Sequence, residues 1–301
     1  MIHLLLLSAC GPGFTLDNFD YEAEYSTHTP VVEDLLSPTL ITTLNDEIYV
    51  YERSEDISIL HQVSADGLQS SIEIPETTLS FYATDENLLA ATEDGVHDTL
   101  NDTLLHEAYE TTHVFEINGA LHWAVEHVAG TEIHNATESV LIEIYSLDDL
   151  HVHNDTIWGI DQRNSYLVSV DTSVPMAEWA GEIQVDFEDE ARRMTINNDA
   201  FYVTTRSSRW PYGGWILKVE GTVGDMTTER LCDSPPEAEH ILVHNEMVYW
   251  SSKQSITTVS TDGGTYEMLA PLTTVGGMLI HNGTLWWTDT KGGRVFNTPV
   301  E

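Results

Sequence analysis

The chain has 301 residues, of which 50 are acidic and 11 are basic, so its formal net charge is −39. A surface this negative repels nucleic acid and anionic membrane surfaces, and the composition excludes nucleic acid as a partner. Lysine is scarce, and self-repulsion of this size is relieved near 1 M salt, where the Debye length is about 3 Å. The acidic surface is therefore typical of a halophilic protein, while solubility alone and a cation-collecting surface are the alternatives.

The first ten residues, MIHLLLLSAC, combine a short apolar run with small residues directly before Cys10. This arrangement resembles the lipobox of bacterial lipoproteins, which implies a signal peptide over residues 1–10 and a lipid on the Cys10 thiol. By the same resemblance, Gly11 carries no inner-membrane retention signal, so the expected location is the cell envelope at the outer membrane. An ordinary buried strand with a chance cysteine is the alternative.

Residues 11–35 contain Gly, Pro, Ser, Thr and acidic residues without a clear period, and they are expected to form an acidic tether. Such a tether would hold a folded domain away from the membrane surface. Its far end, within YEAEYSTHTPVVEDL, is a candidate for a strand that pairs with the C-terminal segment.

The remaining residues, 36–301, repeat one short pattern and are expected to form a single domain. A turn dipeptide is followed by one variable residue and then by three or four mostly apolar ones, as in HNGTLWWTD. Asn-Gly and related pairs favour two-residue hairpin turns because both positions tolerate positive φ. The uninterrupted apolar triplet predicts a strand that is buried on both faces. The pattern occurs at positions 33 to 47 residues apart: Asn45, Asp85, Asn118, Asn154, Asn198, Asn245 and Asn282.

This spacing predicts an all-β fold, namely a seven-bladed β-propeller of four-stranded antiparallel blades, with six or eight blades as the alternatives. Too little chain follows the seventh copy to supply a complete last blade. We therefore expect the N- and C-terminal segments to pair and close the ring, which removes an exposed sheet edge. An open solenoid is the alternative to closure.

The last two copies, ILVHNEMVYWSSKQSITTVSTDGG and MLIHNGTLWWTDTKGGRVFNTPVE, resemble the repeats of YWTD-type and TolB-like bacterial lipoprotein propellers. The other five copies share this resemblance only in outline. YWTD propellers ordinarily have six blades, so the seven copies depart from that pattern. The resemblance implies a propeller fold and offers no catalytic residue to transfer.

One connection departs from the repeat. The segment RSSRWPYGG, from Arg206 to Gly214, follows the fifth central strand, where other copies have only a few polar residues. It carries Arg206, Arg209, Trp210 and Tyr212, which form the predicted ligand-binding site. Guanidinium groups bind carboxylate or phosphate, and aromatic rings bind sugar faces or apolar side chains. The alternative is a loop that packs its own tryptophan against the blade edge.

Fourteen histidines raise the question of metal binding, and His151 and His153 share one strand face. However, His153, His244 and His281 each precede the turn asparagine of a different copy, which favours hydrogen-bonding support of the hairpin. We therefore assign no metal site and no cofactor. Cys232 lies in RLCDSPPEAE, which is expected to form a loop without disulfide partners.

The sequence contains no P-loop, no G-x-S-x-G motif and no triad spacing, so no catalytic residue is assigned. The favoured function is a monomeric, lipid-anchored, non-enzymatic binding or scaffold module with an envelope protein or glycan as its partner. The alternative is a propeller enzyme, either a lyase or a metal-dependent lactonase. Its site would require acids, Asn or His from several blades at the axial channel. A purely structural envelope component is the third hypothesis.

Overall fold

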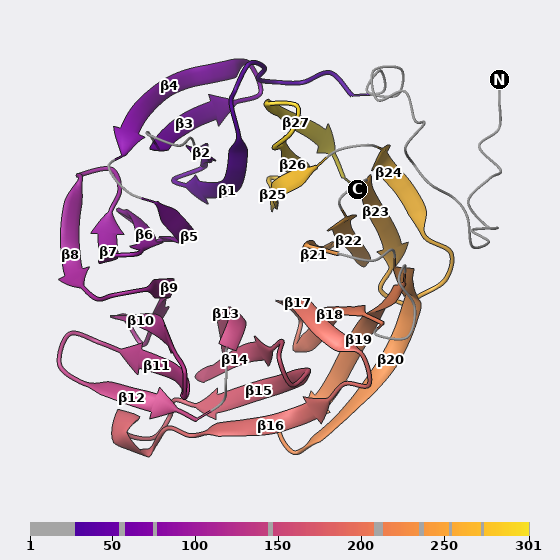
Figure 1. Ribbon diagram of the computed structural model, residues 1–301. Coiled ribbons are helices and arrows are strands. Elements are labelled where there is room, and N and C mark those ends of the chain that lie inside the picture. Colours follow the sequence, from indigo (N-terminus) through magenta and orange to yellow (C-terminus); the bar gives the residue numbers. More distant parts are fainter. Residues whose placement is uncertain are drawn as a thin grey trace.

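The chain folds into seven antiparallel β-sheets that are arranged like spokes around one axis (Figure 1). The computed structural model describes residues 28–53, 58–74, 77–143, 147–207, 213–234, 238–252, 255–271 and 274–300. Over these ranges the chain forms β-strands apart from turns and one short 3-10 helix, η3 (Met176–Glu178). The predicted seven-bladed propeller is confirmed. No described helix has the length and apolar character needed to cross a membrane.

In each blade the strands follow chain order from the axis outward (Figure 1). Blade 1 contains β1 (Pro38–Leu44), β2 (Glu47–Arg53), β3 (Ser58–Ser64) and β4 (Gly67–Ile74). Blade 2 contains β5 (Thr78–Ala83), β6 (Leu88–Thr92), β7 (Gly95–Asp98) and β8 (Thr103–Glu107). Blade 3 contains β9 (Thr111–Ile117), β10 (Ala120–His127), β11 (Gly130–His134) and β12 (Ser139–Ile142).

The second half of the chain repeats this order. Blade 4 contains β13 (Leu147–His153), β14 (Thr156–Asp161), β15 (Tyr166–Asp171) and β16 (Gly181–Asp186). Blade 5 contains β17 (Glu190–Asn197), β18 (Ala200–Arg206), β19 (Gly214–Thr222) and β20 (Asp225–Ser234). Blade 6 contains β21 (His240–His244), β22 (Met247–Ser252), β23 (Ser255–Ser260) and β24 (Glu267–Pro271). Blade 7 contains β25 (Val275–His281), β26 (Thr284–Asp289) and β27 (Arg294–Pro299).

The N-terminal side of the chain completes blade 7. The N–H groups of Val31 and Val32 donate to the carbonyl of Val295 at 2.7 and 3.3 Å, and the Val295 N–H donates back to Val32 at 2.9 Å. Leu35 donates to Gly293 at 3.0 Å. These bonds confirm the predicted closure of the ring, and the closing residues lie within the stretch that the sequence indicated.

The apolar triplets form the second strand of each blade, as predicted. In β22 and β26 the side chains of Trp250 and Trp287 are 0% and 1% exposed. Both faces of these strands are covered because each blade stands between two neighbours. The apolar side chains of the described residues form seven clusters, and each cluster lies between two successive blades.

The two-residue turns have the predicted backbone in six of the seven copies. Asn45 and Asp46, for example, have φ values of 52° and 64°. The copy at Asp85 is different, because the Thr84 hydroxyl accepts hydrogen bonds from the N–H groups of Glu86 and Asn87 within the same loop and stabilises a longer connection.

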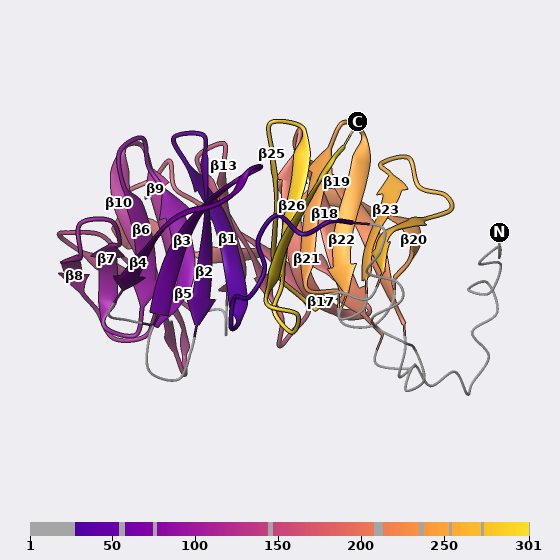
Figure 2. The same cartoon turned by 90° about the horizontal axis from the view of Figure 1, so that it is seen from above.

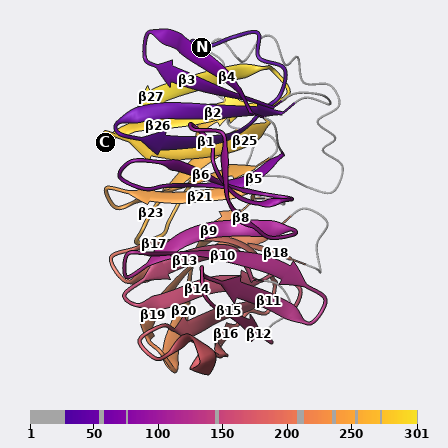
Figure 3. The same cartoon turned by 90° about the vertical axis from the view of Figure 1, so that its left-hand side faces the viewer.

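The inner strands run roughly along the axis and the outer strands lie more across it, so the molecule is a disc with two faces (Figures 2 and 3). We call the face that carries the two-residue turns the turn face. We call the opposite face, where the inner strand of each blade begins and its second strand ends, the entry face. The connections between second and third strands lie on the entry face.

Candidate functional site

The predicted ligand-binding loop begins and ends on the entry face. Arg206 is exposed at the end of β18, opposite Glu190 in the register. The Ser207 N–H donates to the Gly213 carbonyl at 2.8 Å, so the two ends of the loop are adjacent. The other three predicted contact residues, Arg209, Trp210 and Tyr212, lie outside the described residues, as does Cys10. The binding loop therefore stays a prediction.

A second candidate site lies around the axis, at equivalent positions of the inner strands. Counting back five residues from the first residue of each turn gives one inner-strand position per blade. We call the residues at these seven positions the axial ring: Leu40, Ser80, His113, Asp149, Arg193, His240 and Gly277. In six of the seven inner strands a β-bulge interrupts the ladder close to this level. Bulges change the direction of the side chains beside them.

The inner edge of each sheet needs hydrogen-bond partners, because the first strand of a blade has no neighbour on its axial side. Side chains of the axial ring supply several of these partners from one blade to the next. The cross-blade bonds are Ser80 Oγ to the Thr112 carbonyl (2.9 Å), the Met194 N–H to the Asp149 carboxylate, and Arg193 Nε to the Glu239 carbonyl (3.1 Å).

Two side chains of blade 4 contact the backbone N–H and the backbone carbonyl of Met194. Asp149 accepts its N–H, and the Nε2 of His151 lies 3.1 Å from its carbonyl oxygen. Since a carbonyl only accepts, Nε2 of His151 carries the proton in this contact. The inner edge of blade 5 is thus saturated by two side chains of the preceding blade.

The ring histidines are kept neutral by burial. Desolvation lowers the pKa of His113 to about 4, against an opposing effect of Asp149 and with smaller lowering effects of His151 and Arg193. Desolvation also lowers the pKa of His240 to about 4; Arg193 adds to this shift, while Asp149 and hydrogen bonding to the backbone of the next blade oppose it. Both imidazoles nevertheless retain some solvent exposure, so water reaches them although they lie on innermost strands.

Imidazole, carboxylate and guanidinium groups from four successive blades therefore lie at equivalent positions of the inner strands, and an axial enzyme site would require such groups. They do not form a metal centre in the described part of the chain, where no three His, Cys, Asp or Glu side chains are grouped closely enough to hold an ion. The ring residues were missed in the sequence because their strands differ in composition. Counting back five residues from each turn would have found them.

The histidines on the turn face have the predicted structural role. The Nδ2 atoms of the turn asparagines lie 2.8 to 3.0 Å from Nε2 of the histidine before them, in the pairs His153–Asn154, His244–Asn245 and His281–Asn282. His153 also contacts Asp199 of the next blade at 2.6 Å. That contact holds the pKa of the Asp199 carboxyl below its usual range.

Cys232 lies in strand β20, so the expected loop at this position is wrong. The strand pairs with β19 as far as Ser234, directly before two prolines that cannot extend the ladder. The thiol is 7% exposed, and burial raises its pKa to about 12. A thiol of this kind is a core residue and has little nucleophilic character.

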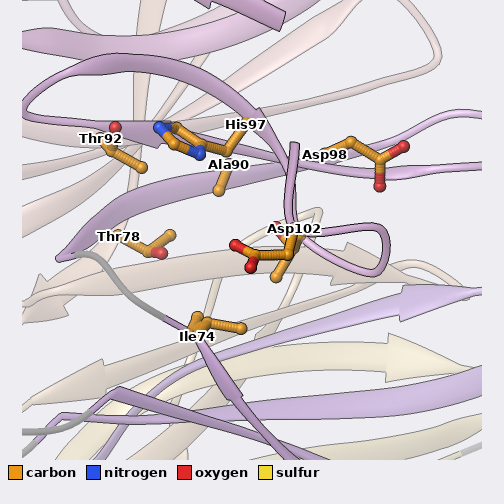
Figure 4. Close-up of a pocket in the computed structure, with 8 residues that line it drawn as sticks. Ile74, Thr78, Ala90, Thr92, His97, Asp98 and Asp102 are labelled. Carbon is orange, nitrogen blue, oxygen red and sulfur yellow. The ribbon is translucent and has the colours of Figure 1, made fainter. Parts of the chain in front are cut away.

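A small hollow lies between blades 1 and 2, and Figure 4 shows Ile74 on one side of it with Thr92 and His97 on the other. It has room for about one water molecule. Thr92 donates to the Gly95 carbonyl at 3.1 Å, and Asp98 accepts from Asn101. These polar groups stabilise turns, and the hollow is too small for an organic ligand.

Basic residues are concentrated in blade 5, together with six acidic residues between residues 190 and 234. Six of the eleven basic residues of the chain lie between residues 190 and 234: Arg192, Arg193, Arg206, Arg209, Lys218 and Arg230. Arg230 lies over the ring of Trp215, whose indole N–H donates to Asp189 at 2.7 Å. One sector of an otherwise acidic disc therefore carries most of the groups that can attract an anion.

No protein-family model and no curated protein matches the sequence. Similar solved structures include a gluconolactonase from Xanthomonas campestris, with 14% identity, 91% and 98% of the two chains covered and a TM-score of 0.51. BamB from Moraxella catarrhalis has 10% identity, coverage of 88% and 85%, and a TM-score of 0.56. The extracellular domain of BT4673 from B. thetaiotaomicron has 9% identity and a TM-score of 0.68 over 90% of this chain and 42% of that one. These similarities establish the propeller fold alone.

Proposed function

We propose that the protein is a non-enzymatic binding propeller of the cell envelope, anchored by a lipid at Cys10, that holds an envelope protein or glycan on its entry face. The observation that carries the proposal is the concentration of basic residues in blade 5, whose exposed Arg206 stands at the start of the predicted loop. Six acidic residues balance the six basic ones between residues 190 and 234, so this sector repels a partner with carboxylate or phosphate groups less than the rest of the acidic surface does.

The axial ring supports binding over catalysis. A general base works best when its pKa lies near the operating pH, whereas burial places the pKa of His113 and His240 at about 4. Moreover, Asp149, His151 and Arg193 each use a polar atom to saturate the backbone of the next blade. Groups held in this way position a ligand more readily than they transfer protons.

A propeller enzyme is the second candidate. It is favoured by the approach of His113, Asp149 and His240 from three different blades, and the similar structures include a gluconolactonase. Hydrolysis of lactone substrates that is unaffected by Asp149→Asn and His113→Gln would reject this candidate as an axial enzyme.

The location and anchor depend on the lipobox-like N-terminus, and one of the similar structures is an extracellular domain. The test is incorporation of a labelled fatty acid into the wild-type chain and into Cys10→Ser. We expect labelling and detergent-phase partition for the wild type and neither for Cys10→Ser. Equal labelling of both chains would refute the anchor.

The binding face is tested by cross-linking in envelopes followed by affinity capture. We expect Trp210→Ala combined with Tyr212→Ala to lose the partners captured by the wild type. Tyr109→Ala is the matched control, because Tyr109 is 75% exposed in a connection between blades 2 and 3. Unchanged capture by the double variant, or equal loss in the control, would contradict the assignment of the loop.

A further inference from the structure

Two opposite charges on the inner strands of neighbouring blades do not form an ion pair. Asp149 lies on β13 and Arg193 on β17, at equivalent positions of the axial ring, and these strands are neighbours around the centre (Figure 1). Among the described residues, no carboxylate oxygen lies within 4.0 Å of the Arg193 guanidinium nitrogens. An unpaired arginine is unexpected in a chain with 50 acidic residues.

Backbone hydrogen bonds hold the two charges apart. Nε of Arg193 donates to the Glu239 carbonyl at 3.1 Å, which leaves its two Nη atoms without a recorded acceptor in the described part of the chain. One carboxylate oxygen of Asp149 accepts the Met194 N–H, and the other has Nε2 of His151 at 3.9 Å, beyond hydrogen-bonding distance. Each charged group therefore keeps polar atoms that these hydrogen bonds do not use.

His113 contributes a third available atom beside this pair. The Thr112 hydroxyl donates to the Ala124 carbonyl at 3.3 Å, so its oxygen accepts from Nδ1 of His113 at 3.1 Å. In a neutral imidazole this leaves Nε2 as an acceptor. The Met194 N–H that Asp149 accepts is the backbone group directly after Arg193, and β9 lies beside β13 around the centre (Figure 1), so the three ring positions are adjacent. All three side chains are partly exposed, so solvent reaches them.

We propose that Asp149, Arg193 and His113 bind a small zwitterion of the α-amino acid class. Its carboxylate lies against the Nη atoms of Arg193, where two parallel N–H···O bonds form, and its ammonium group lies against the free oxygen of Asp149 and Nε2 of His113. The two protein charges cancel, as do those of the ligand, so the long-range field of a −39 protein does not oppose binding. The site goes beyond the proposed function, because it requires neither the loop nor the lipid anchor.

The test is isothermal titration calorimetry of the full chain with glycine, and with acetate and methylammonium as its two halves, at matched ionic strength. We expect saturable binding of glycine, with each half bound about 10-fold or more weakly because each makes only one set of charged contacts. Absence of saturable glycine binding, or acetate binding as tight as glycine, would overturn the proposal.

Three charge-neutralising variants locate the site. We expect Arg193→Gln and Asp149→Asn to weaken glycine binding about 10-fold or more. The two variants should also differ in which half of glycine they bind better: Asp149→Asn should favour acetate, and Arg193→Gln should favour methylammonium. A merely structural role of these residues would not produce this difference. Arg192→Gln is the matched control, because Arg192 pairs with Glu190 at 2.9 Å. Full binding by Arg193→Gln, or equal loss in Arg192→Gln, would refute the assignment.

A measurement on the wild type covers the case in which a variant does not fold. In protein labelled with ¹⁵N-arginine, the eight arginines of the chain give few Nε–H signals, and the signal of Arg193 is assigned from its absence in Arg193→Lys. We expect glycine to shift this signal saturably and sodium chloride to leave it in place. A constant Arg193 signal in the presence of glycine would overturn the proposal independently of the variants.

Discussion

The inner strands of neighbouring blades must be joined around the axis. Blades 4 to 6 are joined in a different way from blades 7 and 1. Between blades 4 and 6, charged side chains of the axial ring cross to the backbone of the next blade, as Asp149 and Arg193 do. At the junction, Gly276 and Gly277 instead let two inner strands approach closely, and the Thr290 hydroxyl donates to the Pro38 carbonyl at 2.8 Å.

The two regions therefore differ in what they contribute: the junction closes the ring, whereas blades 4 to 6 can bind a ligand. The glycine junction brings backbone against backbone, so its two glycines offer no side chain to a ligand. The charged sector spans the gap with long side chains, and such side chains have ends that remain available. A site can therefore arise in blades 4 to 6 as a consequence of how those blades are joined, whereas the junction contributes rigidity.

The largest effect is expected at the junction. A Cβ on Gly276 would lie 2.5 Å from the Pro38 carbonyl oxygen and 2.8 Å from Thr39 Cα, both of which are backbone atoms. We expect Gly276→Val to lower the free energy of unfolding by about 3 kcal/mol or more, measured by urea denaturation. Gly213→Ala is the control, since its Cβ would meet no atom within 4 Å. Equal stability of Gly276→Val and wild type would show that the strands separate easily.

A smaller loss is expected in the charged sector. Asp149→Ala leaves the Met194 N–H without its acceptor, so we expect a decrease of about 1–3 kcal/mol in the free energy of unfolding. Glu73→Ala removes the same charge from an exposed position on β4 and should change little. A loss in Asp149→Ala no larger than in Glu73→Ala would mean that the cross-blade bond does not contribute.

Acid sensitivity is expected to arise at the axial ring as well. The pKa of His113 and of His240 is about 4 in the folded chain and near 6.5 when unfolded, so the unfolded state binds more protons between these values. Stability should therefore fall as the pH drops from about 6.5 to 4. The double variant His113→Gln, His240→Gln should show a shallower fall in thermal midpoint. Parallel profiles for the two proteins would exclude these histidines as the source.

The smallest effect is expected on the turn face. His153 contacts Asp199 of the next blade, but Asp199 is fully exposed, and solvent screens the contact. We expect His153→Gln to shift the thermal midpoint less than Asp149→Ala does. A larger shift would show that exposed contacts join the blades more strongly than the axial ring.

The seven apolar triplets predicted the fold because burial between two blades requires the same residue types at every central strand. Ring closure was also predictable, because pairing of the N- and C-terminal segments removes an exposed sheet edge. The axial ring was not predictable, because any residue that can saturate a backbone edge can occupy its positions. Ser80, Arg193 and Gly277 occupy equivalent positions although their side chains differ completely. The loop at Cys232 was wrongly expected because nearby prolines indicated a turn while the strand runs up to them.

Hydrogen exchange at the Met194 amide tests most directly whether side chains of one blade saturate the inner edge of the next. In the wild type we expect slow exchange, because Asp149 accepts this N–H. In Asp149→Ala we expect exchange at Met194 to accelerate while amides in the buried strand β22 remain protected. Fast exchange at Met194 in the wild type, or the same slow exchange in both proteins, would contradict the proposed joining of blades 4 and 5.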